Sequence, residues 1–267
     1  MQTVAVVNSK GGVGKTTTAI CLAGALVDKG RRVLLIDLDP QASASVWLGA
    51  PSDGEDLLAL LLERDHDPVP MIRQLPMGLD LIPGGLLLTQ FDPRTSQRPG
   101  RDFFLRNVLE RLPTDRWDYA FIDTPGSFGI LALNALAAAD AFLVPVEAAT
   151  LSLEPLLTQF QAIEETRQAL NPRLRCAGIL ATRVNLTARN PLQILDLLHS
   201  HFGTQVLRAF IRNNVNLAEA PAHRTYISAY LRSSNGARDY ARVGQEFETR
   251  LGIPEAADLP LRRAGNA

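Results

Sequence analysis

Short apolar runs and stretches with helical spacing alternate along this chain. The first run is Val4 to Val7, and residues 18–27 then place apolar side chains at intervals of three and four. An uninterrupted apolar run of this length is typical of a buried strand, and the spacing in 18–27 is typical of a helix. The chain is therefore predicted to open with a strand, a polar loop and a helix.

The same alternation continues along the chain, as apolar runs that end in polar residues or turns predict further strands. We expect strands within residues 31–37, 78–85, 117–123, 141–146, 175–182 and 205–211, helices within 57–62, 103–112, 130–139, 151–170, 191–202 and 233–250, and an exposed loop at 89–101. Strands that alternate with helices favour an α/β fold: a single doubly wound domain with a mostly parallel, twisted sheet flanked by helices. We assign residues 1–250 to this domain and 251–267 to a C-terminal tail.

The predicted helix at 151–170 has an ambiguous apolar face. Its large apolar side chains recur at spacings of three and four and fit either the protein core or a dimer surface, with the core favoured: Leu153, Leu156, Leu157, Phe160 and Ile163.

The composition, 46% hydrophobic and 21% charged, is that of a soluble globular protein. No apolar run is long enough to cross a membrane, and the N-terminus lacks the pattern of a signal peptide. We therefore expect a cytoplasmic protein. Its two cysteines, Cys21 and Cys176, have no metal-binding spacing and are expected in the core.

Charge is divided unevenly between the two halves of the chain. Residues 1–150 carry 13 basic and 18 acidic residues, whereas residues 151–267 carry 14 arginines and 10 acidic residues. A basic half is consistent with a surface that binds a polyanion, although an excess of this size also fits an ordinary solvated surface.

The loop at residues 8–17 carries the clearest chemistry. Its glycines leave the backbone free to adopt positive φ and to turn N–H groups inward, and the first turn of the following helix attracts an anion. Lys15 is suited to neutralise the β- and γ-phosphates, and the Thr16 hydroxyl is suited to Mg²⁺. A tight turn without a ligand is the alternative, but the lysine and threonine in register after a strand favour a phosphate loop of the P-loop NTPase type.

Carboxylates follow two other predicted strands. Asp37 and Asp39 end the strand at 31–37, and Asp123 ends the strand at 117–123. Ligands of open α/β sheets gather at the carboxyl ends of the strands, where Asp123 is suited to hold a Mg²⁺-bound water near the γ-phosphate. The alternative for Asp37 and Asp39 is that they only cap the next helix.

Several motifs together resemble the ParA/MinD family of deviant P-loop ATPases. They are K-G-G-x-G-K-T-T at residues 10–17, D-x-D-P-Q at 37–41, the Walker B position at Asp123 and, less closely, the box at 213–221. The resemblance covers about residues 2–250. It implies ATP and Mg²⁺ as cofactors, ATP hydrolysis, and an ATP-dependent homodimer in which Lys10 reaches the phosphates of the partner subunit.

The resemblance also assigns roles along the chain. Lys10, Lys15 and Asp39 are expected to be catalytic, Asp39 by positioning the attacking water, and the expected metal-site residues are Thr16, Asp37 and Asp123. The expected nucleotide contacts are Lys10, Gly11, Gly12, Val13, Gly14, Lys15, Thr16 and Thr17, with Thr182, Arg183, Arg212 and Asn214 at the base.

The box Asn213–Pro221 is similar to that of the chromosomal Soj branch, but asparagines stand at 213 and 216 where that branch has arginines. The branch implies binding of nonspecific double-stranded DNA as the ATP dimer, and stimulation by a ParB-like adaptor. We expect neighbouring arginines to supply the DNA contacts: Arg208, Arg212, Arg224, Arg232, Arg238 and Arg242.

Two other readings stay open. The same mechanism serves a protein cargo, such as a microcompartment or a chemoreceptor cluster, in some relatives. A MinD-like membrane ATPase needs an amphipathic C-terminal helix, which residues 255–267 do not provide, so we expect no membrane binding and a nucleoid-associated protein. Because the phosphate loop starts within the first ten residues, we expect no helix-turn-helix domain before it and no operator reading.

Overall fold

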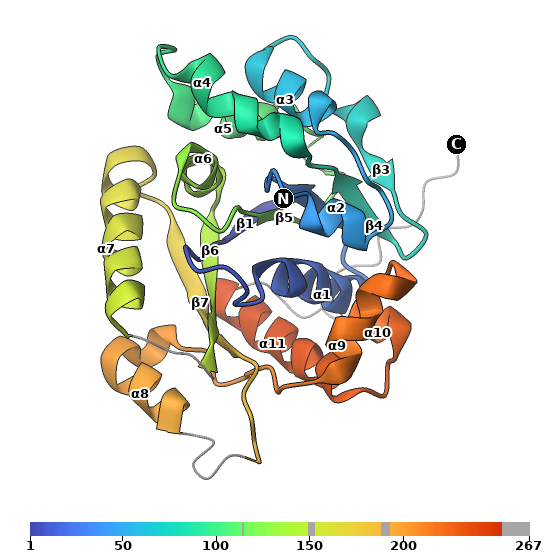
Figure 1. The fold of residues 1–267 in the computed structure, drawn as a ribbon, viewed down its shortest axis with the longest axis vertical. Coiled ribbons are helices and arrows are strands. Elements are labelled where there is room, and N and C mark those ends of the chain that lie inside the picture. The colour runs from blue at the N-terminus through green and yellow to red at the C-terminus, as the bar shows by residue number, and fades with distance from the viewer. Residues whose placement is uncertain (114, 149–152, 188–192, 253–267) are drawn as a thin grey trace.

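The structure is a computed structural model that describes residues 1–113, 115–148, 153–187 and 193–252. Within these ranges, seven strands form one sheet in the order β3-β4-β2-β5-β1-β6-β7 (Figure 1). Every neighbouring pair is parallel except β3 with β4. The strands are β1 (Gln2–Val6), β2 (Val33–Asp37), β3 (Arg73–Gln74), β4 (Leu79–Ile82), β5 (Tyr119–Asp123), β6 (Ala141–Glu147) and β7 (Arg175–Thr182). The mostly parallel α/β sheet predicted from the alternation is confirmed.

Helices cover both faces of this sheet (Figure 1). The first face packs against α1 (Lys15–Val27), α2 (Ser43–Trp47), α9 (Val215–Glu219), α10 (Ile227–Tyr230) and α11 (Asn235–Leu251). The second face packs against α3 (Glu55–Leu62), α4 (Phe91–Thr95), α5 (Phe104–Glu110), α6 (Ile130–Ala138), α7 (Leu153–Leu170) and α8 (Gln193–Phe202). The central strands are therefore buried on both sides, which is why they read as continuous apolar runs.

The register of the central strands brings the predicted carboxylates together. Asp37 is paired with Asp123 across β2 and β5, and Asp123 is paired with Val6 across β5 and β1. These parallel strands end at the same edge of the sheet. The chain leaves β1 at that edge and enters the glycine loop, so the loop and the carboxylates share one site.

Residues 89–101 are not the exposed loop that their polarity predicted. Residues 91–95 form α4, in which Phe91 and Thr95 are buried. The ring of Phe91 packs edge-on against that of Phe104, with the centroids 5.9 Å apart. The prediction was wrong here because one buried aromatic side chain anchors an otherwise polar segment to the core.

The strand expected at 205–211 is present only as isolated bridges. Val206 pairs with Ile179 and Arg212 with Val184, beside β7. Between them, the backbone N–H groups of residues 208 and 209 donate to the Glu246 carboxylate of α11. The segment therefore runs alongside β7 without forming a regular strand.

Three other predictions lie partly outside the described residues: the starts of the helices predicted from residues 151 and 191, and the tail predicted at 251–267. The helix α11 ends at Leu251 and is capped by Gly252, and residues 253–267 of the tail are not described. In α7, Leu156 and Ile163 are buried, as the core reading expects, whereas Leu157 is 46% exposed.

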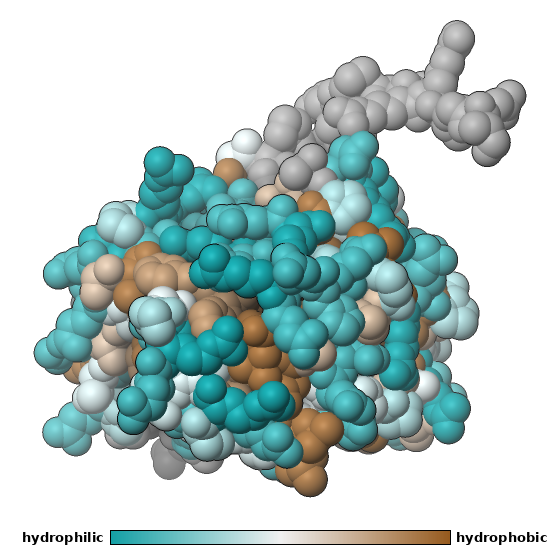
Figure 2. All heavy atoms as spheres, turned by 90° about the horizontal axis from the view of Figure 1, so that it is seen from above, coloured by the Kyte–Doolittle hydropathy of each residue, from teal (hydrophilic) through white to brown (hydrophobic). Residues whose placement is uncertain are grey.

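No helix in the described part of the chain is long and apolar enough to cross a membrane. The face in Figure 2 is largely hydrophilic, with one hydrophobic strip running across it. The large apolar side chains with the highest exposure belong to different segments of the chain: Val46, Leu86 and Val215.

A close contact between α1 and the segment before α10 gives a stability prediction. A Cβ atom added to Gly24 would lie 2.3 to 2.7 Å from three ring atoms of Tyr226. We expect Gly24→Ala to lower the free energy of unfolding by about 1–3 kcal/mol, because the buried ring must move, although alanine favours helix. Urea denaturation measures this loss.

Gly244 in α11 is the matched control for Gly24. A Cβ atom there would meet the nearest atom of Leu22 at 3.7 Å, an ordinary contact. Gly244→Ala is expected to leave stability unchanged or raise it by up to about 1 kcal/mol. Equal effects of the two substitutions would contradict the packing argument.

Candidate nucleotide-binding site

The glycine loop has the backbone geometry that phosphate binding requires. It joins the end of β1 to Lys15, the first residue of α1. Gly12 and Gly14 adopt φ values of +76° and +91°, which side chains other than glycine rarely tolerate. A Cβ atom at Gly11 or Gly12 would meet no atom within 4 Å, so this side of the loop faces open space. The loop therefore offers its backbone to a ligand at the N-terminus of α1.

Lys15 lies inside the loop, with the residue only 7% exposed. Its ammonium group donates a hydrogen bond to the backbone carbonyl of Lys10 at 3.2 Å. Burial lowers the pKa of Lys15, and the nearby carboxylates of Asp123 and Asp39 oppose that change. The site thus holds a buried cation between the loop backbone and the two carboxylates. Because the cation is shielded from water, its attraction for an anionic ligand is strong.

Asp37 is buried at the end of β2 and binds α2. Its Oδ2 accepts hydrogen bonds from the backbone N–H and the hydroxyl of Ser45, at 2.7 and 2.6 Å. Burial raises the pKa of Asp37 to about 6, and the bonds from Ser45 oppose the rise. The helix-holding role considered as the alternative is therefore present. Asp39 lies two residues further, and its Oδ1 accepts from the Gln41 N–H at 2.9 Å.

Asp123 is the most unusual acid in the site. Both of its carboxylate oxygens are buried, and neither has a hydrogen-bond partner among the described residues. Burial and the charge of Asp37 raise its pKa well above the usual range, while the neighbouring Thr16 hydroxyl, which forms no hydrogen bond of regular geometry with it, and the charge of Lys15 oppose the rise. Unpartnered buried carboxylate oxygens need a cation or an ordered water.

The donor set fits Mg²⁺ bound together with a nucleotide. Among the described residues, no group of three or more His, Cys, Asp or Glu side chains could hold a metal ion by itself. Mg²⁺ characteristically takes one or two protein oxygens and completes its shell with water and substrate phosphates. Thr16 and Asp123 are suited to contribute in that way, and a cation between Asp123 and Asp37 would offset their repulsion.

Two residues that support the loop were not identified from the sequence. Asn8 donates from Nδ2 to the Pro145 carbonyl at 2.7 Å, and its Oδ1 accepts from the Lys10 N–H at 2.8 Å. Gln159 of α7 contacts Ser9. A buried polar residue at the end of a strand was the available signal for Asn8, whereas nothing in the sequence connects Gln159 with residue 9.

The four residues expected at the base have partners within the protein. The Thr182 hydroxyl donates to the Val13 carbonyl of the loop at 2.8 Å, and Arg183, at φ +51°, makes an ion pair with Glu147. The guanidinium of Arg212 binds Asp239 through two nitrogens, and Asn214 caps α9. The bond between Thr182 and Val13 thus joins β7 to the loop. Direct contacts of these four residues with the adenine base of a nucleotide remain predictions.

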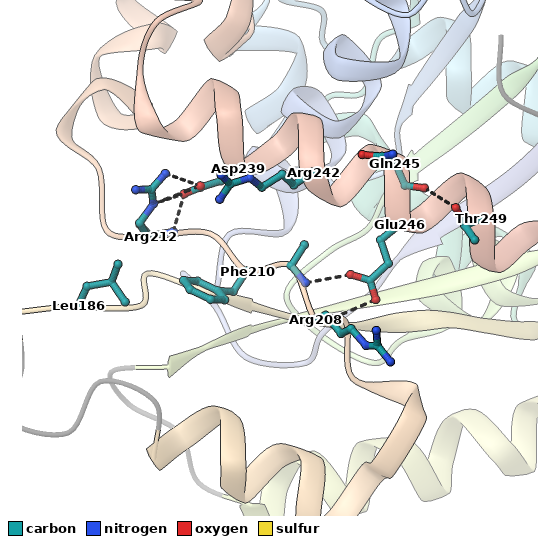
Figure 3. Close-up of a pocket in the computed structure, with 10 residues that line it drawn as sticks. Leu186, Arg208, Phe210, Arg212, Asp239, Arg242, Gln245, Glu246 and Thr249 are labelled. Carbon is teal, nitrogen blue, oxygen red and sulfur yellow. Dashed lines mark hydrogen bonds and ion pairs between the residues drawn. The ribbon is translucent and has the colours of Figure 1, made fainter. Parts of the chain in front are cut away.

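A groove lies between α11 and the segment that follows α8 (Figure 3). Its volume is about 530 Å³, and its lining includes Arg208, Phe210, Arg212, Asp239 and Arg242. Arg212 is bound to Asp239, whereas the guanidinium groups of Arg208 and Arg242 form no ion pair within the described residues. The other predicted DNA arginines are exposed elsewhere on the C-terminal half: Arg224, Arg232 and Arg238.

A glycine loop between a strand and a helix, with acids at the ends of adjacent parallel strands, defines a P-loop nucleotide-binding protein. The sequence model of a family described as "AAA domain" matches residues 1–176. The chain is 37% identical to the chromosome partitioning protein ParA of Myxococcus xanthus over 250 residues, 92% of this chain and 88% of that protein. It is 38% identical to the chromosome-partitioning ATPase Soj of Thermus thermophilus over 256 residues, 93% and 96% of the two chains. The chain belongs to the ParA/Soj family of chromosome-partitioning ATPases.

Solved structures of other proteins share the fold of this chain. The cobyrinic acid a,c-diamide synthase of Mycobacterium smegmatis, solved with ADP and magnesium, superimposes with a TM-score of 0.80 at 30% identity, covering 91% of this chain and 92% of the other. The cell division ATPase MinD of Pyrococcus furiosus superimposes with a TM-score of 0.74 at 22% identity, covering 93% and 98%. The second likeness concerns the fold alone.

Proposed function

We propose that this protein is a Mg²⁺-dependent ATPase that acts in DNA segregation through two assembly states. With ATP it forms a dimer that binds double-stranded DNA without sequence preference, and slow hydrolysis, stimulated by a ParB-like adaptor, releases it. The observation that carries the proposal is the buried, unpartnered carboxylate of Asp123 beside Thr16, Lys15 and the open glycine loop. The names of the partitioning relatives and the ADP and magnesium in a structural neighbour support it.

Each residue of the site has a proposed role. The backbone of residues 11–17 binds the phosphate chain, and Lys15 compensates its charge. Thr16 and Asp123 would hold the Mg²⁺ ion, which would supply neutralisation of phosphate charge when bound. Asp37 keeps α2 in place while Asp39 orients the attacking water, because its carboxylate lies at the same edge of the sheet. Lys10 acts on the nucleotide of the partner subunit.

The residues expected at the base divide into two groups. Thr182 supports the loop from behind through its bond to Val13, so we assign it a positioning role. Arg183, Arg212 and Asn214 lie on the segments that follow β7 and precede α9, and we keep them as candidates for the adenine side. In the structure they bind Glu147, Asp239 and the backbone of α9, and these bonds fix the conformation of the two segments.

The groove beside α11 is the proposed place for DNA phosphates. Arg208 and Arg242 line it without an ion pair in the described part of the chain, so their charge is available to a polyanion. Binding through phosphates is insensitive to sequence and weakens steeply as salt rises. Dimerisation doubles the number of such contacts, which couples DNA binding to the ATP state.

The test is binding to a random-sequence duplex across a salt series, with ATP, with ADP and without nucleotide. We expect binding only with ATP, and we expect Arg208→Ala/Arg242→Ala to reduce the slope of log affinity against log salt by about 2 per subunit. The control Arg94→Ala, at an exposed arginine of α4, should keep the slope. Binding to anionic lipid vesicles is measured under the same three nucleotide conditions. Binding to vesicles with ATP, and no binding to DNA, would contradict the proposal and favour a MinD-like protein.

A further inference from the structure

A buried side chain of α7, that of Gln159, is hydrogen-bonded to the start of the glycine loop. Gln159 is 5% exposed, and its Oε1 accepts from the Ser9 N–H at 3.1 Å and from the Ser9 hydroxyl at 3.3 Å. Its Nε2 donates to the Val7 carbonyl at 3.4 Å. The amide therefore holds the chain on both sides of Asn8, about 150 positions away in the sequence.

The apolar neighbours of Gln159 on α7 make this amide unusual. Leu156 and Ile163 pack into the core, and Phe160 packs against Phe142 and Phe202. A buried amide in such surroundings costs free energy unless its oxygen and nitrogen are hydrogen-bonded. Here the bonding partners all belong to the segment that leads into Lys10.

The segment before Lys10 is fixed at several points. Asn8 bridges the Pro145 carbonyl and the Lys10 N–H, and the Lys10 carbonyl accepts from Lys15. Gln159 fixes Ser9, the residue directly before Lys10. These bonds fix the backbone on both sides of Ser9, and the Lys10 side chain leaves from this fixed backbone.

We propose that Gln159 is a positioning residue that sets the direction of Lys10 and thereby supports ATP-dependent dimerisation without touching the nucleotide. This inference rests on the proposed function of Lys10 across the dimer. On this inference, nucleotide binding and dimerisation depend on different residues of the loop. Binding of ADP by one subunit depends on Gly12, Gly14 and Lys15, whereas dimerisation with ATP also depends on the direction of the Lys10 side chain.

The decisive variant is Gln159→Met, which keeps the length of the side chain and removes its hydrogen bonds. Gln161→Met is the matched control, because Gln161 lies on the exposed side of α7 and bonds only to Glu165 within the described residues. ADP affinity is measured by calorimetry, the ATP-dependent dimer by analytical ultracentrifugation, and folding by thermal unfolding. We expect Gln159→Met to weaken dimerisation at least tenfold and ADP affinity less than threefold, and we expect the control to change neither.

A double variant tests whether the effect passes through Lys10. Lys10→Ala alone is expected to keep ADP binding and to impair dimerisation, and Lys10→Ala/Gln159→Met should be no worse than Lys10→Ala. If the double variant lost dimer affinity by the product of the two single losses, the inference would be overturned. If Gln159→Met does not fold, Ser9→Ala removes one of the same bonds and should weaken dimerisation two- to threefold in the same direction.

Other outcomes distinguish this inference from the proposed function. A wild-type chain that stays monomeric with ATP overturns both. A wild-type chain that dimerises, with Gln159→Met and Ser9→Ala dimerising equally well, overturns only the role of Gln159. An equal loss of ADP affinity and dimerisation in Gln159→Met also overturns it, because the amide would then support the whole loop rather than Lys10.

Discussion

Replacing Lys15 by alanine is expected to abolish measurable binding of ATP and ADP. The ammonium group is the buried cation of the glycine loop, near Asp123 and Asp39. Without it, the phosphates would face the carboxylates of Asp123 and Asp39 after the loss of the buried ammonium group that compensates their charge. A charge-assisted hydrogen bond to a buried anion contributes about 1.5–3 kcal/mol, so an affinity loss of roughly 10- to 150-fold is the minimum, and the added repulsion increases it. Isothermal titration calorimetry with ADP measures it.

Lys29→Ala is the control for this change. Lys29 follows α1 and makes an ion pair with Glu248, away from the glycine loop. The substitution is expected to lower stability, because Glu248 is buried, but to leave ADP affinity unchanged. If Lys15→Ala bound ADP like the wild type, the phosphates would have to lie elsewhere and the assigned site would be wrong.

Asp39→Ala is expected to accumulate an ATP-bound dimer that turns over very slowly. The carboxylate follows β2 at the edge of the sheet where the loop lies, and it is only half-buried, so a water molecule can reach it. A group that orients the attacking water typically contributes about 10²–10⁴ in rate, and we expect a loss in that range with ATP binding retained. Phosphate release and sedimentation with ATP measure the two effects together.

Asp53→Ala offers a close structural match. Asp53 Oδ1 accepts from the Glu55 N–H at 3.0 Å, just as Asp39 Oδ1 accepts from the Gln41 N–H at 2.9 Å. Both substitutions therefore remove the same local turn bond, and only one removes a carboxylate beside the proposed phosphate site. Turnover at the wild-type rate in Asp39→Ala, or an equal loss in Asp53→Ala, would contradict the role of Asp39.

The arginines of the C-terminal half illustrate what residue type alone leaves undecided. Arg208, Arg212 and Arg242 look equivalent in the sequence, but Asp239 binds Arg212 through two nitrogens while the other two line the groove without ion pairs in the described residues. The pairing depends on α11 lying against the segment after α8. Charge counting could therefore locate the basic half without saying which of its arginines are available.

The sequence by itself determined the parallel α/β sheet, the glycine loop and the edge where the carboxylates gather. These features are local: residues 8–17 are contiguous, buried strands appear as apolar runs, and parallel strands end at one edge, so Asp37 and Asp123 were expected at the same edge. That they are direct neighbours follows from the pairing of β2 with β5. The roles of Lys10 and Asp39 came from the resemblance of those contiguous motifs to a family.

Only the tertiary structure decided which distant side chains support the site. It brought Gln159 to Ser9, paired Asp239 with Arg212, replaced a regular strand at 205–211 by bonds to Glu246, and buried Phe91 in a segment that reads as a loop. The physical reason is the same in each case. The spacing of apolar residues predicts that a side chain is buried, but it does not identify the side chains that it packs against. When the partner of a polar group lies far along the chain, that partner is determined by how the helices pack on the sheet.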